Sequence, residues 1–212
     1  MDISKTISDF LRLQYFVGAS HARELAAAFL GYKSHASYLA ATSAAKLSSD
    51  QIDVLIPDLA CLGNRLQTIT SLPPLPNERQ LAKEIGDDLK SQKLFSGSVL
   101  IAKDQAELKE LMHGGYLHDN VSLEDELSGV IAVSNSWFGY ESYNQVKVAT
   151  EKAAIVIHAS GVFNGEHDDE SERPNHGDII DFDVTLRLQL TAWGIGFRQT
   201  IFANGNLRSH YA

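Results

Sequence analysis

Three prolines within four residues divide the chain into two stretches of different character. Pro73, Pro74 and Pro76 lie in the segment 71–77, and no helix continues through them because proline lacks a backbone N–H and fixes φ. Such a segment is extended and stiff, which is typical of a spacer; a proline-rich ligand for a partner's aromatic groove is the less favoured interpretation. We therefore predict a helical module over residues 1–72, a connector over 73–77 and a second domain over 78–212.

The stretch before the prolines carries the capping residues of short helices. Near the N-terminus, apolar residues recur at helical spacing, and Gly18 is expected to end this first helix. Ser20 predicts the N-cap of a second helix that ends at Gly31, and Ser34 predicts the N-cap of a third. Pro57 fits the first turn of a further helix. The whole stretch is thus predicted to be helical.

Beyond the prolines the pattern changes from helical to strand-like. The predicted helices cover 78–94 and 105–113, and the predicted strands cover 96–102, 129–133, 145–149, 154–158, 179–188 and 193–202. Within 179–188, alternate residues are apolar, so one face of this strand is expected to be buried and the other wet. Short connections favour an antiparallel meander without a parallel βαβ unit. The predicted fold class is α+β, with one or two helices beside an antiparallel sheet in the second domain.

Charge and cysteine content limit the class of protein. The chain has 212 residues with 18 basic and 27 acidic side chains, a net charge of −9; a protein that wraps duplex DNA over most of its surface is basic instead. Its single cysteine, Cys61, allows no internal disulfide and no cysteine-rich zinc finger. The N-terminus lacks the apolar run of a signal peptide, and no stretch is long enough to cross a bilayer. A cytoplasmic protein without membrane contact is expected.

One helical hairpin, over residues 21–46, could touch nucleic acid. The small Ala27 lies four residues before Gly31, a spacing that suits the close helix packing of a helix-turn-helix. Its second helix offers Lys33, His35 and Ser37 as candidate nucleic-acid contacts. A typical reader of DNA places several Arg and Lys side chains there, so an ordinary helical hairpin is favoured and nucleic acid is the less expected partner.

The same hairpin resembles a known segment. It begins His21-Ala22, passes through Leu30-Gly31-Tyr32-Lys33-Ser34 and ends Tyr38-Leu39-Ala40-Ala41. In this run, residues 21–41 are similar to the small helical segment of bacterial glyoxalase-related proteins. The resemblance implies an accessory helical module of bacterial type and no glyoxalase chemistry.

The segment 164–178 gathers carboxylates and imidazoles between two predicted strands. Oxygen and nitrogen ligands of this kind hold divalent metal ions, and the candidate ligands are Glu166, His167, Asp168 and Asp178. Their spacing matches neither an EF-hand loop nor a His-Glu-X-X-His helix. A solvated hairpin loop is therefore favoured over a metal site, and no other cofactor is expected. A metal-dependent hydrolase is one alternative function.

An aromatic run supplies the candidate interface, which consists of Trp137, Phe138 and Tyr140. On a strand, Trp137 and Phe138 point to opposite faces, so at least one ring is expected to be exposed. An exposed ring serves a protein interface or the stacking of a nucleic-acid base. Rings that pair across a sheet are the plainer interpretation.

Motifs of catalysis are missing from the sequence. It contains no Gly-X-Ser-X-Gly elbow, Walker A loop or Gly-X-Gly-X-X-Gly fingerprint, and no catalytic residue is assigned. The leading prediction is a non-catalytic binding or regulatory protein that acts through its acidic surface on a basic protein partner. The alternatives are the metal-dependent hydrolase and a DNA-binding regulator that uses the hairpin at 21–46.

Overall fold

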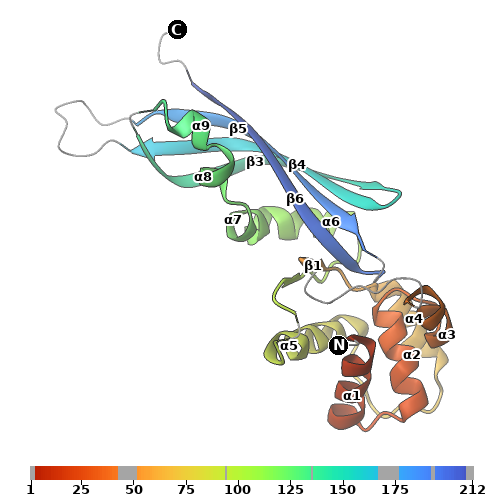
Figure 1. Cartoon of the computed structure of the whole chain (residues 1–212). Coiled ribbons are helices and arrows are strands. Elements are labelled where there is room, and N and C mark those ends of the chain that lie inside the picture. Colours follow the sequence, from red (N-terminus) through yellow and green to blue (C-terminus); the bar gives the residue numbers. More distant parts are fainter. Residues whose placement is uncertain are drawn as a thin grey trace. The chain divides into compact units, whose positions relative to one another are not determined.

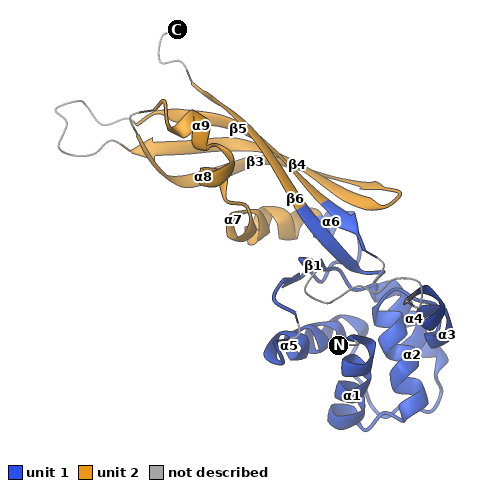
Figure 2. Cartoon of the chain, viewed as in Figure 1, with its two compact units in different colours: residues 1–108, 188–199 blue, residues 109–187, 200–212 orange. Residues whose placement is uncertain are grey.

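The chain folds into the α+β class that the sequence predicts (Figure 1). The computed structural model describes residues 3–42, 52–93, 95–134, 136–166, 177–191 and 194–208. Contacts divide the chain into two compact units, the first formed by 1–108 with 188–199 and the second by 109–187 with 200–212 (Figure 2). The predicted connector, residues 73–77, lies inside the first unit, and the domain boundary expected there stays a prediction.

Helices dominate the first unit. Those that lie wholly within it are α1 (Ile3–Tyr15), α2 (Ala19–Phe29), α3 (His35–Thr42), α4 (Leu59–Thr68) and α5 (Glu78–Ser91). The predicted ends at Gly31 and Ser34 are confirmed, since Gly31 adopts φ +77° after α2 and Ser34 Oγ accepts a hydrogen bond from the Ser37 N–H in α3. The predictions for Gly18 and Ser20 were wrong. Phe16 ends α1 with φ +56°, Gly18 is the N-cap of α2, and Ser20 lies inside that helix.

The core of the first unit lies where these helices meet. Six consecutive residues from Leu25 to Leu30 are buried, which makes α2 the central helix, in contact with α1, α3 and α4. Besides Leu25, Phe29 and Leu30, the largest fully buried side chains of the cluster are Ile7, Leu11, Leu55, Leu62, Leu81, Ile85 and Leu89. The apolar spacing that predicted the helices therefore also selected their buried faces.

Two very short strands lie in the first unit, and only the second falls within a predicted strand, 96–102. β1 (Val54–Leu55) pairs in parallel with β2 (Ser98–Val99) and antiparallel with β6 (Gly196–Leu207), where Val54 is the partner of Phe197. The N-terminal region is therefore helical as predicted except at β1, and the sheet contains one parallel pair that the predicted antiparallel meander lacks. A two-residue strand is too short to show any periodicity in the sequence.

The long strands form the rest of a six-stranded sheet in the order β2-β1-β6-β5-β4-β3. Besides β6, they are β3 (Trp137–Glu151), β4 (Ala154–Glu166) and β5 (Ile179–Leu190). The predicted alternation of β5 is confirmed, because its buried residues are Ile180, Phe182, Val184, Leu186 and Leu188. Strand β3 is the last in this order, so among the described strands only β4 pairs with it.

Short helical segments of the second unit connect to this sheet. After α6 (Gln105–Leu111) follow the segment η2 (Met112–Tyr116), in which the helix is kinked at Gly115 with φ +154°, and then α7 (Leu117–Asn120), α8 (Leu123–Glu126) and α9 (Ser128–Ile131). The strand predicted over 129–133 was wrong, because these residues close helical hydrogen bonds such as Ile131 N to Leu127 O. An apolar run this short does not distinguish strand from helix. No helix among the described residues has the length and apolar content needed to cross a membrane.

Candidate functional site

Two β-bulges decide which side chains the edge strand β3 presents to solvent. They lie between Phe138 and Tyr140 and between Tyr143 and Gln145. Each bulge adds one residue without a partner, so the alternation of faces restarts after it. As a result Trp137 and Tyr140 share the outer face of the sheet, 81% and 71% exposed, while Phe138 on the other face is 5% exposed. The predicted opposition of Trp137 and Phe138 is thus observed.

One acidic residue shares the outer face with these rings. Glu166 is the partner of Trp137 across the β3–β4 ladder, and directly opposed residues share one face. Asp178 lies at the same end of the sheet but on the other face, with Phe138 and Gly165, because its carbonyl accepts a hydrogen bond of 2.9 Å from Gly165 N and Ile180, two residues further on, is buried. We call Trp137, Tyr140 and Glu166 the aromatic patch.

Of the four predicted metal ligands, Glu166 belongs to the aromatic patch and Asp178 lies on the opposite face of the sheet. The other two, His167 and Asp168, lie outside the described residues. Within the part of the chain that the structure describes, no three His, Cys, Asp or Glu side chains gather closely enough to hold a metal ion. Glu166 is therefore an acid beside an exposed indole, and Asp178 does not join it on that face.

A polar hollow of about 190 Å³ continues the outer face along the sheet. Lys147 on β3 is the partner of His158 on β4, and His158 Nδ1 lies 3.1 Å from Thr185 Oγ1 on β5. Gln145, Ser160 and Asp183 complete its polar lining. Sequence reasoning identified the wet face of β5 but missed this group, because the register of three strands has to be known before its members meet.

On the inner face, the buried Tyr143 of β3 contacts histidines of η2 and α7. The Tyr143 carbonyl accepts a hydrogen bond of 3.1 Å from His113 Nε2, and the His118 ring contacts the Tyr143 ring edge-on. His118 Nδ1 also lies 3.1 Å from a carboxylate oxygen of Glu141. Burial, and then the charge of Glu141, raise the pKa of Tyr143, so its phenol stays neutral. The group fixes η2 and α7 against β3.

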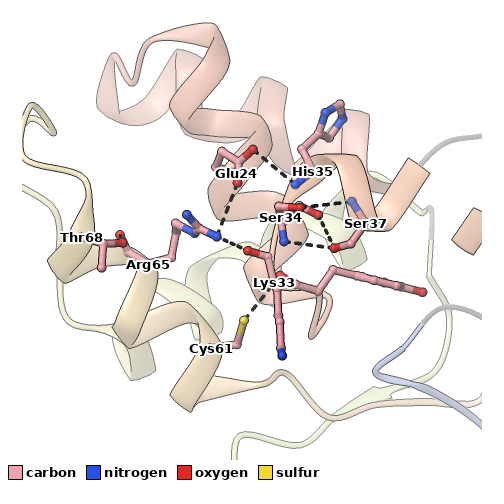
Figure 3. A network of polar contacts seen from close by, with 9 residues as sticks. Glu24, Lys33, Ser34, His35, Ser37, Cys61, Arg65 and Thr68 are labelled. Carbon is pink, nitrogen blue, oxygen red and sulfur yellow. Dashed lines mark hydrogen bonds and ion pairs between the residues drawn. The ribbon is translucent and has the colours of Figure 1, made fainter. Parts of the chain in front are cut away.

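In the first unit, a network of polar contacts holds the hairpin of α2 and α3 (Figure 3). Arg65 of α4 donates to the Lys33 carbonyl and lies 3.6 Å from the Glu24 carboxylate. Glu24 in turn accepts a hydrogen bond of 3.3 Å from His35 N. Ser37 Oγ donates to the carbonyl of Ser34 and accepts from its N–H. These contacts fix the turn between the two helices.

The predicted nucleic-acid contacts therefore have structural partners of their own. The hydroxyl of Ser37 is used in the cap of α3, and the backbones of Lys33 and His35 are bound by neighbouring helices. Between residues 35 and 42 the sequence has no Lys or Arg, so Lys33 is the one cationic side chain at this predicted contact. The prediction of a DNA contact stays a prediction.

Cys61 lies at the same turn and is half-buried. Its Sγ is 3.4 Å from the Tyr32 carbonyl oxygen. Burial raises the pKa of the Cys61 thiol, and the negative charge of Asp58 raises it further. Because the thiolate is the nucleophilic form, this cysteine is placed to pack the turn rather than to react.

Comparisons with known proteins give no relative from which a function could be transferred. No protein-family model matches the chain, and the searches of curated proteins and of solved structures yield no match either.

Proposed function

We propose that the protein is a non-catalytic binding protein whose aromatic patch docks a basic, extended segment of a protein partner. The observation that carries this proposal is the pair of rings, Trp137 and Tyr140, that the bulge of β3 holds on the outer face in solvent. Exposed aromatic rings are enriched where proteins bind one another, since they bury a large area at low entropic cost.

Charge selects the kind of partner. Glu166 lies directly opposite Trp137, and the stretch 110–146 that leads through the helices into β3 holds six acidic residues and no Lys or Arg. An arginine or lysine over the face of an indole gains a cation–π attraction. The neighbouring carboxylates add to that attraction and repel acidic partners. A basic segment therefore fits both the rings and their surroundings.

Position supports the same conclusion. β3 is an edge strand, so a partner can approach the patch from the outer face and from the unpaired side of the strand. The polar hollow around Lys147 and His158 continues along the same face. We infer that the hollow receives the polar residues that follow the basic anchor in the partner's segment.

The proposal is tested with Trp137 as the reporter. In a Trp193→Phe background, the indole of Trp137 is the remaining tryptophan, and its fluorescence is followed during titration with a short arginine–serine peptide. A glutamate–serine peptide of equal length is the matched probe. We expect a saturable change with the arginine peptide alone, weakened by added salt because the patch is exposed.

Variants assign the binding to the patch. Tyr140→Ser and Glu166→Gln should each lower the affinity for the arginine peptide several-fold. Phe202→Ser is the control, because it removes an exposed ring from β6, which is separated from β3 by two strands. This variant should leave the affinity for the arginine peptide unchanged. Binding of both peptides alike, or an equal loss in Phe202→Ser, would contradict the proposal.

The two other predicted functions, a metal-dependent hydrolase and a DNA-binding regulator, are favoured by no specific observation among the described residues. Titration of the protein with Mn²⁺ or with a DNA duplex gives a direct check of each.

A further inference from the structure

A second polar pocket, of about 300 Å³, lies in the first unit, far along the chain from the aromatic patch. Helix α1 contributes Lys5, Ser8, Asp9 and Arg12, helix α2 contributes Arg23, and His35 comes from the start of α3. Ser8 and Arg12 are four residues apart, as are Lys5 and Asp9, so both pairs repeat on the side of α1 that faces the pocket. A pocket of this size is within the range of small-molecule sites.

The lining of this pocket is cationic in an acidic protein. Lys5, Arg12 and Arg23 carry three positive charges against the single negative charge of Asp9, while the whole chain has a net charge of −9. Asp9 lies 3.5 Å from Arg12, and both side chains are about half-exposed. Arg23 forms no ion pair or hydrogen bond with any residue that the structure describes. A cation without a protein partner in a pocket is available to a ligand.

The lining of the pocket includes a buried hydroxyl without a hydrogen-bond partner. Ser8 is 5% exposed, and its Oγ has no hydrogen-bond partner among the described residues. Buried polar groups are nearly always hydrogen-bonded, so an exception calls for an explanation such as a bound group. The hydroxyl of Ser8 and the guanidinium groups of Arg12 and Arg23 supply hydrogen-bond donors in the same pocket, and such a donor set suits an oxyanion.

We propose that this pocket binds the phosphate group of a small phosphorylated molecule. A phosphate monoester carries a charge close to −2 at neutral pH and three strong acceptor oxygens, which balances the excess of two positive charges in the lining. A carboxylate carries one negative charge and two acceptor oxygens, and it leaves part of the lining unbalanced. Arginine is also the side chain best suited to bidentate contact with phosphate.

The experiment measures binding of inorganic phosphate to the full chain by calorimetry at low ionic strength, with acetate at matched ionic strength as the second anion. We expect saturable binding of phosphate and none of acetate. Arg23→Ala should lower the affinity for phosphate at least about tenfold, as is typical when a hydrogen bond to a charged group is lost. Asp9→Asn should raise this affinity, because the substitution removes the one negative charge of the lining.

Matched variants separate this site from general attraction of anions. Arg198→Ala removes the same charge from an exposed arginine on β6, within the first unit but outside the pocket, and it should leave phosphate binding unchanged. Ser8→Ala keeps the helix and should weaken phosphate. The proposal would be overturned if Arg23→Ala and Arg198→Ala lowered the phosphate affinity equally, or if Asp9→Asn lowered it. Saturable binding of acetate as well as phosphate would overturn it too. A titration with glucose 6-phosphate tests whether the pocket accepts a larger ligand. We expect glucose 6-phosphate to bind more tightly than inorganic phosphate.

Discussion

Ser8 shows how a single side chain can lower the stability of a fold. Its buried hydroxyl has no partner in the described part of the chain, and a polar group left unsatisfied in this way costs about 1–3 kcal/mol. We therefore expect Ser8→Ala to raise the free energy of unfolding by about 1 kcal/mol or more, as measured by urea denaturation. A part of that gain comes from the higher helix propensity of alanine.

The control for Ser8 is Ser20→Ala, which makes the same change at an exposed position inside α2. Only the propensity difference of about 0.5 kcal/mol is expected there. If Ser8→Ala destabilised the chain, the hydroxyl would have a partner in solution, and the argument from its burial would be wrong. Together with weaker phosphate binding, a more stable Ser8→Ala variant would mark a residue kept for binding at a cost in stability.

At the scale of elements, the bulge at Gly139 decides what β3 presents to solvent. Deletion of Gly139 removes the unpaired residue and leaves Phe138 opposite Gly165 and Tyr140 opposite Asn164, so Trp137 and Tyr140 keep the outer face. Phe138 is 5% exposed and packs on Phe163 with ring centroids 5.1 Å apart. We expect Phe138→Ala to lower the free energy of unfolding by about 3 kcal/mol and the deletion to lower it by less than about 1 kcal/mol, as measured by urea denaturation.

Gly139→Ala is the matched control for this deletion. A Cβ built at Gly139 meets nothing within 4 Å, and the residue does not adopt a positive φ. The substitution should therefore change stability by less than about 0.5 kcal/mol. A deletion that destabilises the chain as much as Phe138→Ala would show that Gly139 is not the extra residue of the bulge.

Elements with a clear period could be predicted from the sequence, and those without one could not. The alternation of β5 and the helical spacing of α5 are both found in the structure, because burial of one face imposes each pattern over several turns or residue pairs. The two-residue strand β1 is too short for a pattern, and the bulges of β3 depend on a partner strand. The rings of the aromatic patch could be predicted from the sequence, but Glu166 became the neighbour of Trp137 only through strand pairing.

Glu107 links two elements of the first unit and gives their contact a pH dependence. The Lys103 N–H donates to its carboxylate, and Arg79 of α5 forms an ion pair with it. The backbone hydrogen bond first, and then Arg79, lower the pKa of Glu107 from its ordinary value of 4.5 to about 2. Because the folded-state pKa is depressed, this stabilisation is present above pH 4.5 and is lost as the pH falls toward 2.

Glu107→Gln is therefore expected to lower the melting temperature slightly at pH 6, where the wild-type carboxylate is charged. The difference between variant and wild type should shrink as the pH falls from about 4.5 toward 2. Glu110→Gln changes an exposed acid of the same helix that forms no ion pair with a described residue, and it should show no such trend. A difference that stays constant over this pH range would contradict the assignment.

At the scale of the whole molecule, the first unit is discontinuous in sequence. It includes residues 188–199, which contain the end of β5 and the start of β6. Ile195 belongs to its core cluster and its carbonyl accepts a hydrogen bond from Ile56 N, while the Phe197 carbonyl accepts one of 3.0 Å from Asp53 N beside β1. A local pattern cannot reveal such a unit, because the two parts are joined by pairing across more than a hundred residues.

The discontinuity predicts how the chain responds to truncation. A fragment of residues 1–108 lacks Ile195 and the antiparallel partner of β1, so its core and one strand edge are left open. We expect this fragment to melt well below the full chain, as followed by circular dichroism. Ile195→Ala in the full chain isolates the core contribution and should cost about 2–4 kcal/mol, the usual range for a buried isoleucine.

Leu190→Ala is the matched variant, since Leu190 belongs to the same segment but is among the exposed large apolar residues. It should cost less than Ile195→Ala, about 1 kcal/mol, because 37% of Leu190 stays exposed against 4% of Ile195. If fragment 1–108 unfolded at the temperature of the full chain and Ile195→Ala were as mild as Leu190→Ala, the distant segment would be dispensable. The helices and β1 would then form a complete unit, and the phosphate pocket could be studied in that fragment alone.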